Sequence, residues 1–381
     1  MSQSQDGNRL ISVDLLRIFA ALAITLFHLA YFSWSDPQND TATVLRQMVS
    51  FPELVSLRSW TWVGVPIFFV LSGFVIAYSA SSATALSYAQ SRFLRLAPAL
   101  WICATITLIA ALLVGWSGPT NGLADAYLRS MTLWPGALWI DGVYWTLGIE
   151  VAFYLLVFAL LLLRRFDWLQ AVMIAVAFLS GATLLLRAAK RVGFDVWAPT
   201  VSRFTELLLL DHGVYFALGV FIWLAALRGR TPVRVAMVLA CVSLGVVGLA
   251  LDRRHDGITA STLWLASVAF LWIAVHWQSR IEWIGPRARW TIAILGLATY
   301  PLYLLHNIVG AAIMRGVLLL GADRFIALAV AILAVVVLSV TITLTIEPKT
   351  RSFLRNRLAP QVPKRSPDQA SIVTRRARAL N

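Results

Sequence analysis

The chain contains a succession of apolar segments, each about as long as a helix must be to cross a bilayer. About ten can be recognised, at residues 10–33, 60–82, 96–116, 143–163, 168–187, 205–227, 233–251, 258–278, 290–313 and 325–346. Because the bilayer core offers no hydrogen-bond partners to a backbone, such segments must be helical. The sequence therefore predicts an all-α polytopic membrane protein, a bundle of about ten transmembrane helices forming one domain over residues 1–348.

The net charge of +14 does not indicate a nucleic-acid partner, because the basic residues are dispersed between the apolar segments and gathered in the tail. Most of them fall on the side of the N-terminus, so the positive-inside rule predicts that both termini are cytoplasmic. The cluster Arg187, Lys190 and Arg191 opposes this locally. The basic tail, residues 349–381, is expected to be partly disordered and to lie near anionic lipid. We expect a multi-pass protein of the bacterial inner membrane.

Two outer loops, residues 34–59 and 117–142, are the longest and are candidates for a lid or an acceptor vestibule. Cys103 and Cys241 lie in separate apolar segments and show no metal-ligand spacing, so neither a disulfide nor a metal is expected. The first apolar segment is too long for a cleavable signal peptide and should be retained as a helix. The sequence gives no indication of oligomeric state.

The first segment carries three ionisable side chains on one helical face. Arg17 and His28 are separated by about three helical turns, and Asp14 precedes Arg17 by one turn. Ionisable residues inside a transmembrane helix cost several kcal/mol unless they face a partner or a watery cavity, on the order of 2.5–3.5 kcal/mol or more each. Two interpretations stay open: Asp14 and Arg17 pair near the surface while His28 binds a neighbouring helix, or His28 is a general base and Arg17 a phosphate site.

Other segments hold further polar groups with the same ambiguity. Ser72 and Gly73 interrupt an apolar run, which is typical of close helix packing. Arg92 and Arg95 are either topogenic charges or, with Arg17, a cradle for phosphate. Glu150 is too costly to face lipid.

The later segments add two more groups of polar residues. Asp211 and His212 could line a wet entrance, whereas Tyr303 and His306 are at helical spacing. Depth counted along the helices puts Arg17 in the inner leaflet, and it puts the two histidines His28 and His306, with Glu150, in the outer half.

Assembled in order, these residues resemble acyltransferase family 3, which comprises membrane O-acyltransferases. The matching segments are DLLRIFAALAITLFH with Arg17 and His28, FFVLSGF at 68–74, RFLRLAP at 92–98, WTLGIE at 145–150, FALG at 216–219, YPLYLLH at 300–306 and IEP at 346–348. The resemblance implies transfer of an acyl group, usually acetyl, from cytoplasmic acyl-CoA to a hydroxyl of a sugar or glycan at the opposite membrane face. It also implies that His28 is the catalytic base and Arg17 its motif partner.

On this basis we expect three groups of site residues. The catalytic group is His28, Arg17, Glu150 and His306; the acyl-CoA group is Arg17, Arg92, Arg95 and Ser72; the acceptor group is Asp14, Tyr303, Asp211 and His212. The alternative from another class is a secondary transporter for a polar or anionic solute, since buried Arg, His and Glu also form proton relays. A transporter is expected to show repeats and broken helices in matching halves, and the sequence shows no repeat.

Overall fold

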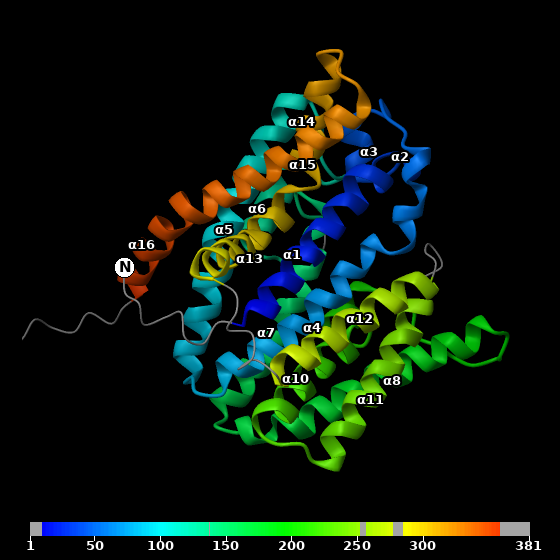
Figure 1. Cartoon of the computed structure of the whole chain (residues 1–381), viewed down its shortest axis with the longest axis vertical. Helices are drawn as coiled ribbons and strands as arrows, with labels where there is room; N and C mark the ends of the chain where they lie inside the picture. The colour runs from blue at the N-terminus through cyan, green and yellow to red at the C-terminus, as the bar shows by residue number, and fades with distance from the viewer. Residues whose placement is uncertain (1–9, 137, 252–256, 277–284, 359–381) are drawn as a thin grey trace, which may run out of the picture.

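The computed structural model describes residues 10–136, 138–251, 257–276 and 285–358, and all the regular secondary structure of these residues is helical (Figure 1). The longer helices are α1 (Ile11–Leu26), α4 (Gly64–Ala80), α5 (Ala85–Val114), α7 (Trp145–Leu162), α8 (Leu169–Arg191), α10 (Gly213–Leu227), α11 (Pro232–Ala250), α12 (Gly257–His276), α13 (Pro286–Leu305), α14 (Ile308–Leu319), α15 (Arg324–Thr341) and α16 (Glu347–Leu358). The shorter helices are α2 (Ser33–Ser35), α3 (Asp40–Leu45), α6 (Leu123–Met131) and α9 (Arg203–Leu207). The prediction of an all-α membrane protein is confirmed.

Nine helical stretches in the described part of the chain are long and apolar enough to cross a membrane. The predicted segment 205–227 is not one of them, and its prediction as a single helix was wrong. There the chain forms α9, then a turn in which Leu209 has a left-handed backbone with φ of 61°, and then the 15-residue α10. A tertiary contact fixes this turn, because the Ser180 hydroxyl of α8 accepts a hydrogen bond from the Val214 amide at the start of α10.

The predicted segment 290–313 is also interrupted, since α13 ends at Leu305 and α14 begins at Ile308. The Asp141 carboxylate accepts the Ile308 amide at 3.2 Å and so caps α14. A residue far away in sequence therefore stabilises the break between the two helices. The two residues at the break, His306 and Asn307, are buried.

At the centre of one core lies α10, which is buried nearly all round. It packs against α4 at two glycines. A Cβ on Gly73 would lie 2.2 Å from the Phe216 carbonyl oxygen, and one on Gly219 would lie 2.0 Å from the Val70 carbonyl oxygen. The two backbones therefore touch, which is the small-residue packing that the sequence around Gly73 indicated.

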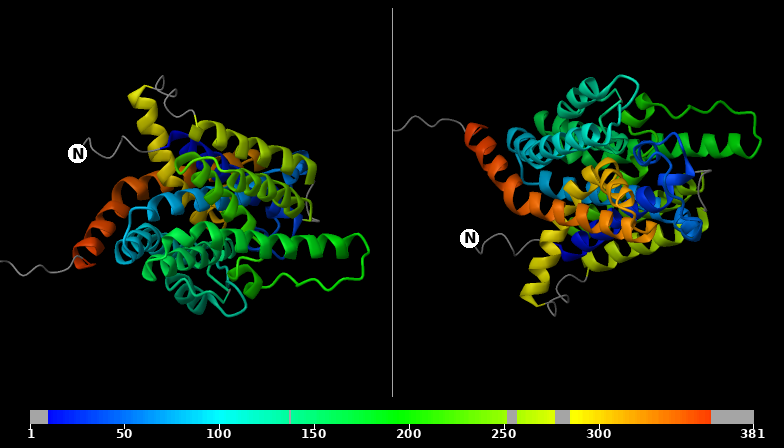
Figure 2. Two further views of the ribbon diagram at one scale, coloured as in Figure 1. Left: turned by 90° about the horizontal axis from the view of Figure 1, so that it is seen from below. Right: turned by 90° about the horizontal axis from the view of Figure 1, so that it is seen from above.

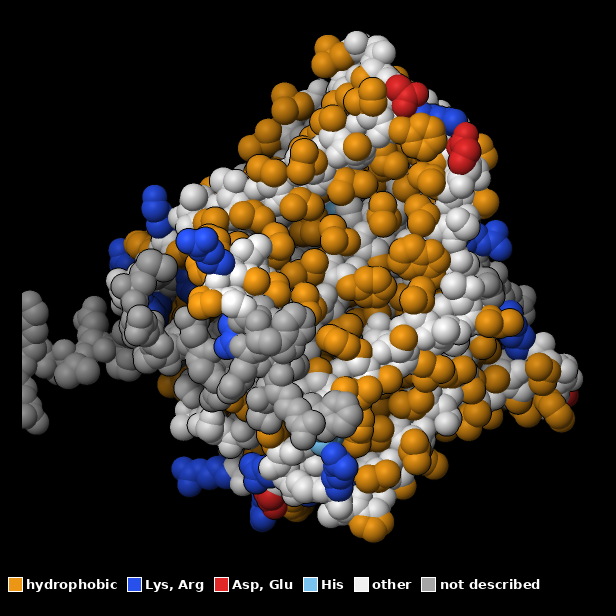
Figure 3. Space-filling model, in the orientation of Figure 1, with side chains coloured by type: hydrophobic (Ala, Val, Ile, Leu, Met, Phe, Trp, Pro, Cys, Tyr) orange, Lys and Arg blue, Asp and Glu red, His pale blue; other side chains and the backbone are white. Residues whose placement is uncertain are grey.

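Apolar side chains cover much of the face seen in Figure 3, and Lys and Arg side chains lie toward its margins. Two ends of the bundle can be distinguished in Figure 1, with α16 at one end and α2, α3 and the tip of α14 at the other. The two further views in Figure 2 also separate α16 from α3. The apolar side chains on the face in Figure 3 fit helices that are surrounded by lipid.

Two boundaries differ from the sequence-based expectation. The α5 helix begins at Ala85 and continues through Pro98, so Arg92 and Arg95 lie within a helix and not in a turn before one. Residues 349–358 of the predicted tail belong to α16. The rest of the predicted tail lies outside the described residues.

Candidate active site

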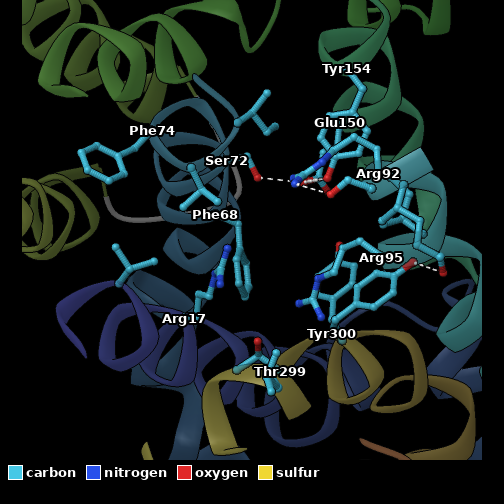
Figure 4. A pocket seen from close by; sticks show the side chains of 18 of the residues that line it. Arg17, Phe68, Ser72, Phe74, Arg92, Arg95, Glu150, Tyr154, Thr299 and Tyr300 are labelled. Atoms are coloured by element: carbon cyan, nitrogen blue, oxygen red, sulfur yellow. Dashed lines mark hydrogen bonds between the residues drawn. The ribbon is translucent and has the colours of Figure 1, made fainter. Parts of the chain in front are cut away.

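A cavity of about 740 Å³ lies between α1, α4, α5, α7, α13 and α16 (Figure 4). Five arginines and two acidic residues line it: Arg17, Arg92, Arg95, Arg351 and Arg355, with Asp14 and Glu150. The cavity also has apolar and aromatic walls. A pocket with this excess of cations and an apolar interior suits a ligand that is anionic at one end and apolar at the other.

The arginines are held by neighbours that leave N–H donors unused. Arg17 projects into the cavity from α1, whereas Arg92 and Arg95 come from α5 on the opposite side (Figure 4). The Arg92 guanidinium carbon lies 5.7 Å from the centre of the Tyr154 ring, and that of Arg95 lies 5.5 Å from the Tyr300 ring. Arg92 Nε and Arg95 Nη1 are buried and have no hydrogen-bond acceptor among the described residues, and Arg95 Nη1 lies 4.0 Å from Glu347 Oε1 in an ion pair. Buried donors of this kind favour a bound anion.

Deeper in the cavity, Glu150 accepts two hydroxyl hydrogen bonds. The Ser72 Oγ donates at 3.0 Å and the Tyr154 hydroxyl at 2.8 Å, both to Glu150 Oε1. Ser72 therefore lines the region expected to bind acyl-CoA, and there its hydroxyl donates a hydrogen bond to Glu150. The structure places Glu150 in the cavity with the arginines, whereas neither histidine lines that cavity. Counting along a helix gives a level but not the neighbours that a side chain faces.

Beyond the cavity, His28 and His306 face each other with ring centroids 5.0 Å apart. His28 lies in a π-helical segment, Phe27–Phe32, that continues α1. Segments of this type occur often at functional sites. His306 Nδ1 lies 2.8 Å from the Tyr303 carbonyl oxygen, an acceptor, so this nitrogen carries the proton in the neutral ring. His306 Nε2 and His28 Nδ1 are buried and have no partner among the described residues.

A polar network supports this histidine pair from the side of α3 and the loop before α7. Asn307 interacts with His28. It donates to the Asp141 carboxylate at 2.8 Å and accepts a bond from the Thr41 hydroxyl. Asp141 lies just before the membrane-spanning α7 region, where burial and the neighbouring Asp40 carboxylate raise the pKa of Asp141 to about 7.

Tyr303 separates the cavity from the histidines. Its ring contacts Phe68, with centroids 6.0 Å apart, on the cavity side and His306, at 5.6 Å, on the other. Its hydroxyl accepts from Thr146 Oγ1 at 2.8 Å. Neither histidine lines the cavity, so Tyr303 lies between this cavity and the histidine pair.

The other residues expected at the acceptor site have different positions. Asp14 lines the cavity beside Arg17, with 3.8 Å between the Asp14 Oδ1 and Arg17 Nη1 atoms. Asp211 forms an ion pair with Arg187. His212 packs against Phe69, and neither Asp211 nor His212 lines this cavity. The Asp211 pair gives Arg187 a structural role.

Sequence reasoning did not include several residues that the structure brings to the site. Tyr154 follows Glu150 by one helical turn, and Arg351 and Arg355 are one turn apart, so helical spacing contained a signal for them. Asn307 stands directly beside His306 in the sequence. Asp141 gave no signal, since it lies in the loop between α6 and α7 and is brought in only by the fold.

Fold and site together define a multi-pass membrane enzyme with a cationic cavity at one end and a buried histidine pair beyond it. The family model described as an acyltransferase domain matches residues 10–346, and the chain belongs to this family, acyltransferase family 3. It is therefore a membrane O-acyltransferase.

Two curated relatives are similar to this chain. Nodulation protein 10 of Rhizobium leguminosarum bv. viciae is 32% identical over 189 residues, 43% of this chain and 48% of that protein. The exopolysaccharide production protein ExoZ of Rhizobium meliloti (strain 1021) is 28% identical over 291 residues, 71% of this chain and 83% of ExoZ. The chain thus spans about half of the first relative and most of the second. No solved structure matches the chain.

Proposed function

We propose that this enzyme transfers an acetyl group from acyl-CoA, bound from the cytoplasm, to a hydroxyl of a carbohydrate acceptor at the opposite membrane face. The observation that carries the proposal is the arginine-lined cavity, with its unused N–H donors at Arg92 and Arg95. Guanidinium groups suit the phosphates of CoA, and the apolar and aromatic walls suit its pantetheine arm. The name of ExoZ, a protein of exopolysaccharide production, supports a carbohydrate acceptor.

In the proposed reaction His28 removes the proton from the acceptor hydroxyl. The oxygen attacks the thioester carbonyl, the carbon–sulfur bond breaks, and the CoA thiolate leaves and takes up a proton. His306, fixed through Nδ1 by the Tyr303 carbonyl, orients His28. A neutral imidazole is the form that such a base requires.

We propose the bacterial inner membrane as the location, with both termini in the cytoplasm. Under this topology α16 and the start of α5, which carry four of the cavity arginines, face the cytoplasm. The donor would enter there. The rhizobial origin of both relatives supports a bacterial membrane.

The proposal is tested by mass spectrometry of surface glycans from cells with and without the protein. A glycan that gains one acetyl group only in the presence of the protein is the expected result. The broken α13–α14 helix is also a feature of transporters, so the purified protein should be assayed in parallel for solute uptake into liposomes. Solute uptake without any acyl transfer would overturn the proposal.

A further inference from the structure

A second cavity, of about 410 Å³, lies at the other end of the molecule. Its lining comes from α3 and its flanks, from the loop after α5, and from Arg315 of α14. The first cavity is lined by residues near the start of α5. The second is lined by Gly115, which directly follows the last residue of α5. Since α5 has 30 residues, it is about 45 Å long. The two cavities are therefore separate sites near opposite ends of one helix.

The charges of this outer cavity favour an anion. Arg46 and Arg315 are close enough to repel each other, and neither forms an ion pair within the described residues. Arg315 is fixed by Nη1, which donates to the carbonyl oxygens of Val44 at 3.3 Å and Val114 at 2.8 Å. By contrast, Arg129 and Arg324 elsewhere in the chain are paired with Asp125 and Glu53.

The remaining lining has the chemistry of a sugar site. Gln38 offers an amide, and Asp40 offers a carboxylate whose position is fixed by the Gly142 amide at 3.0 Å. The Trp116 indole forms a wall and donates to Thr43 Oγ1 at 3.1 Å. Amide and carboxylate groups hydrogen-bond sugar hydroxyls.

Two contacts connect this cavity to the histidine pair. Thr41, next to Asp40, donates to Asn307. Gly142, which binds Asp40, follows Asp141, and Asp141 accepts from Asn307. Neither histidine lines the cavity, so a ligand there occupies a position beside the reaction centre and not in it.

We propose that the outer cavity binds an acidic sugar unit of the acceptor, adjacent to the unit that is acylated. The carboxylate of this sugar is held by Arg46 and Arg315. This inference rests on the proposed function, because it assigns a subsite to the acceptor of that reaction. Binding energy from such a remote unit helps to orient the reacting hydroxyl.

The test is isothermal titration calorimetry of the whole purified protein with a glucuronate-containing tetrasaccharide and with the same tetrasaccharide after reduction of its carboxyl groups. We expect the wild-type protein to bind the acidic form at least about tenfold more tightly. Arg46→Gln should remove this difference, and Arg46→Lys should keep part of it because it keeps the charge. Arg58→Gln is the matched control, since Arg58 is exposed and lines neither cavity.

Equal affinities for the two saccharides in the wild-type protein, or no binding of either, would overturn the inference. So would an unchanged preference in Arg46→Gln. Acyl-CoA binding is measured in the same preparations and should not change in these variants. A wild-type protein that shows no saccharide preference but still binds acyl-CoA counts against the subsite alone, whereas failure of the wild-type protein to bind acyl-CoA counts against the proposed function.

Discussion

At the scale of single residues, the two histidines are the groups best placed to act on a proton. Each has a buried ring nitrogen without a partner among the described residues, and the rings are 5.0 Å apart. We predict that His28→Ala lowers acyl transfer by roughly 10²- to 10⁴-fold without loss of folded protein, because a general base is worth about that much. His306→Ala should have a smaller effect. The measurement is turnover of purified variants in detergent.

His276→Ala is the control for this pair. The His276 Nδ1 atom lies 2.7 Å from the Trp272 carbonyl oxygen of the same helix, and His276 lines neither cavity. Its turnover should match the wild-type value. Wild-type turnover in His28→Ala would remove the base assignment.

Asp141 predicts a pH dependence of stability. Its carboxyl has a pKa of 3.8 in the unfolded chain, and burial followed by the Asp40 charge raises that pKa to about 7 in the folded protein. Between these values the folded state holds a proton that the unfolded state releases, so stability falls as pH rises from about 4 to about 7 and then levels off. The whole change is at most about 4 kcal/mol.

Thermal unfolding in detergent across this pH range measures the effect. Asp141→Asn cannot ionise, so its unfolding temperature should decline less between pH 4 and pH 7 than that of the wild-type protein. Identical pH profiles for the two proteins would show that another group is responsible.

At the scale of helices, α5 combines two functions in one element, because it spans the bundle and presents Arg92 and Arg95 to the cavity. We predict that replacing both by alanine weakens acyl-CoA binding, since each charge-assisted bond to phosphate is worth roughly 1.5–3 kcal/mol. Lysine should restore only part of the affinity. The measurement is the acyl-CoA dissociation constant, with Arg228→Ala as the control.

Arg228 packs on Trp223 and lines neither cavity, so its replacement should leave that constant unchanged. An unchanged constant in the double variant of Arg92 and Arg95 would return these two residues to a role in topology alone.

The contact of α4 with α10 depends on the absence of a side chain at Gly73. A Cβ there would overlap the Phe216 backbone, which cannot give way like the end of a flexible side chain. We predict that Gly73→Ala destabilises the protein by at least about 1–3 kcal/mol, measured as a lower unfolding temperature in detergent. Gly316→Ala is the matched control, since a Cβ on this helical glycine meets nothing within 4 Å. Equal unfolding temperatures for the two variants would contradict this packing.

Much of the helix pattern could be predicted, because segments such as 233–251 must be helical in lipid whatever their neighbours are. The break after Leu305 could not, since it is capped by Asp141 from a distant loop. The same limit applies at the site. Helical spacing brings Tyr154 to Glu150, but only the packing of α7 against α4 and α5 shows that Glu150 faces the arginines.

At the scale of the whole molecule, the two cavities lie near opposite ends of α5, and the histidine pair lies beyond Tyr303. The charged phosphates of CoA are costly to move through the bilayer, whereas the arm and its thioester can reach inward from an arginine-lined cavity. Under the proposed function, donor and acceptor enter from opposite faces, and only the acyl group crosses between them.

Sealed proteoliposomes of known protein orientation test this sidedness most directly. Acyl-CoA is supplied only on the face that carries α16, and a membrane-impermeant saccharide acceptor is held only on the other face. We predict acylated acceptor under these conditions, and loss of the product in His28→Ala. Product that forms only when both substrates are on the α16 face would contradict it.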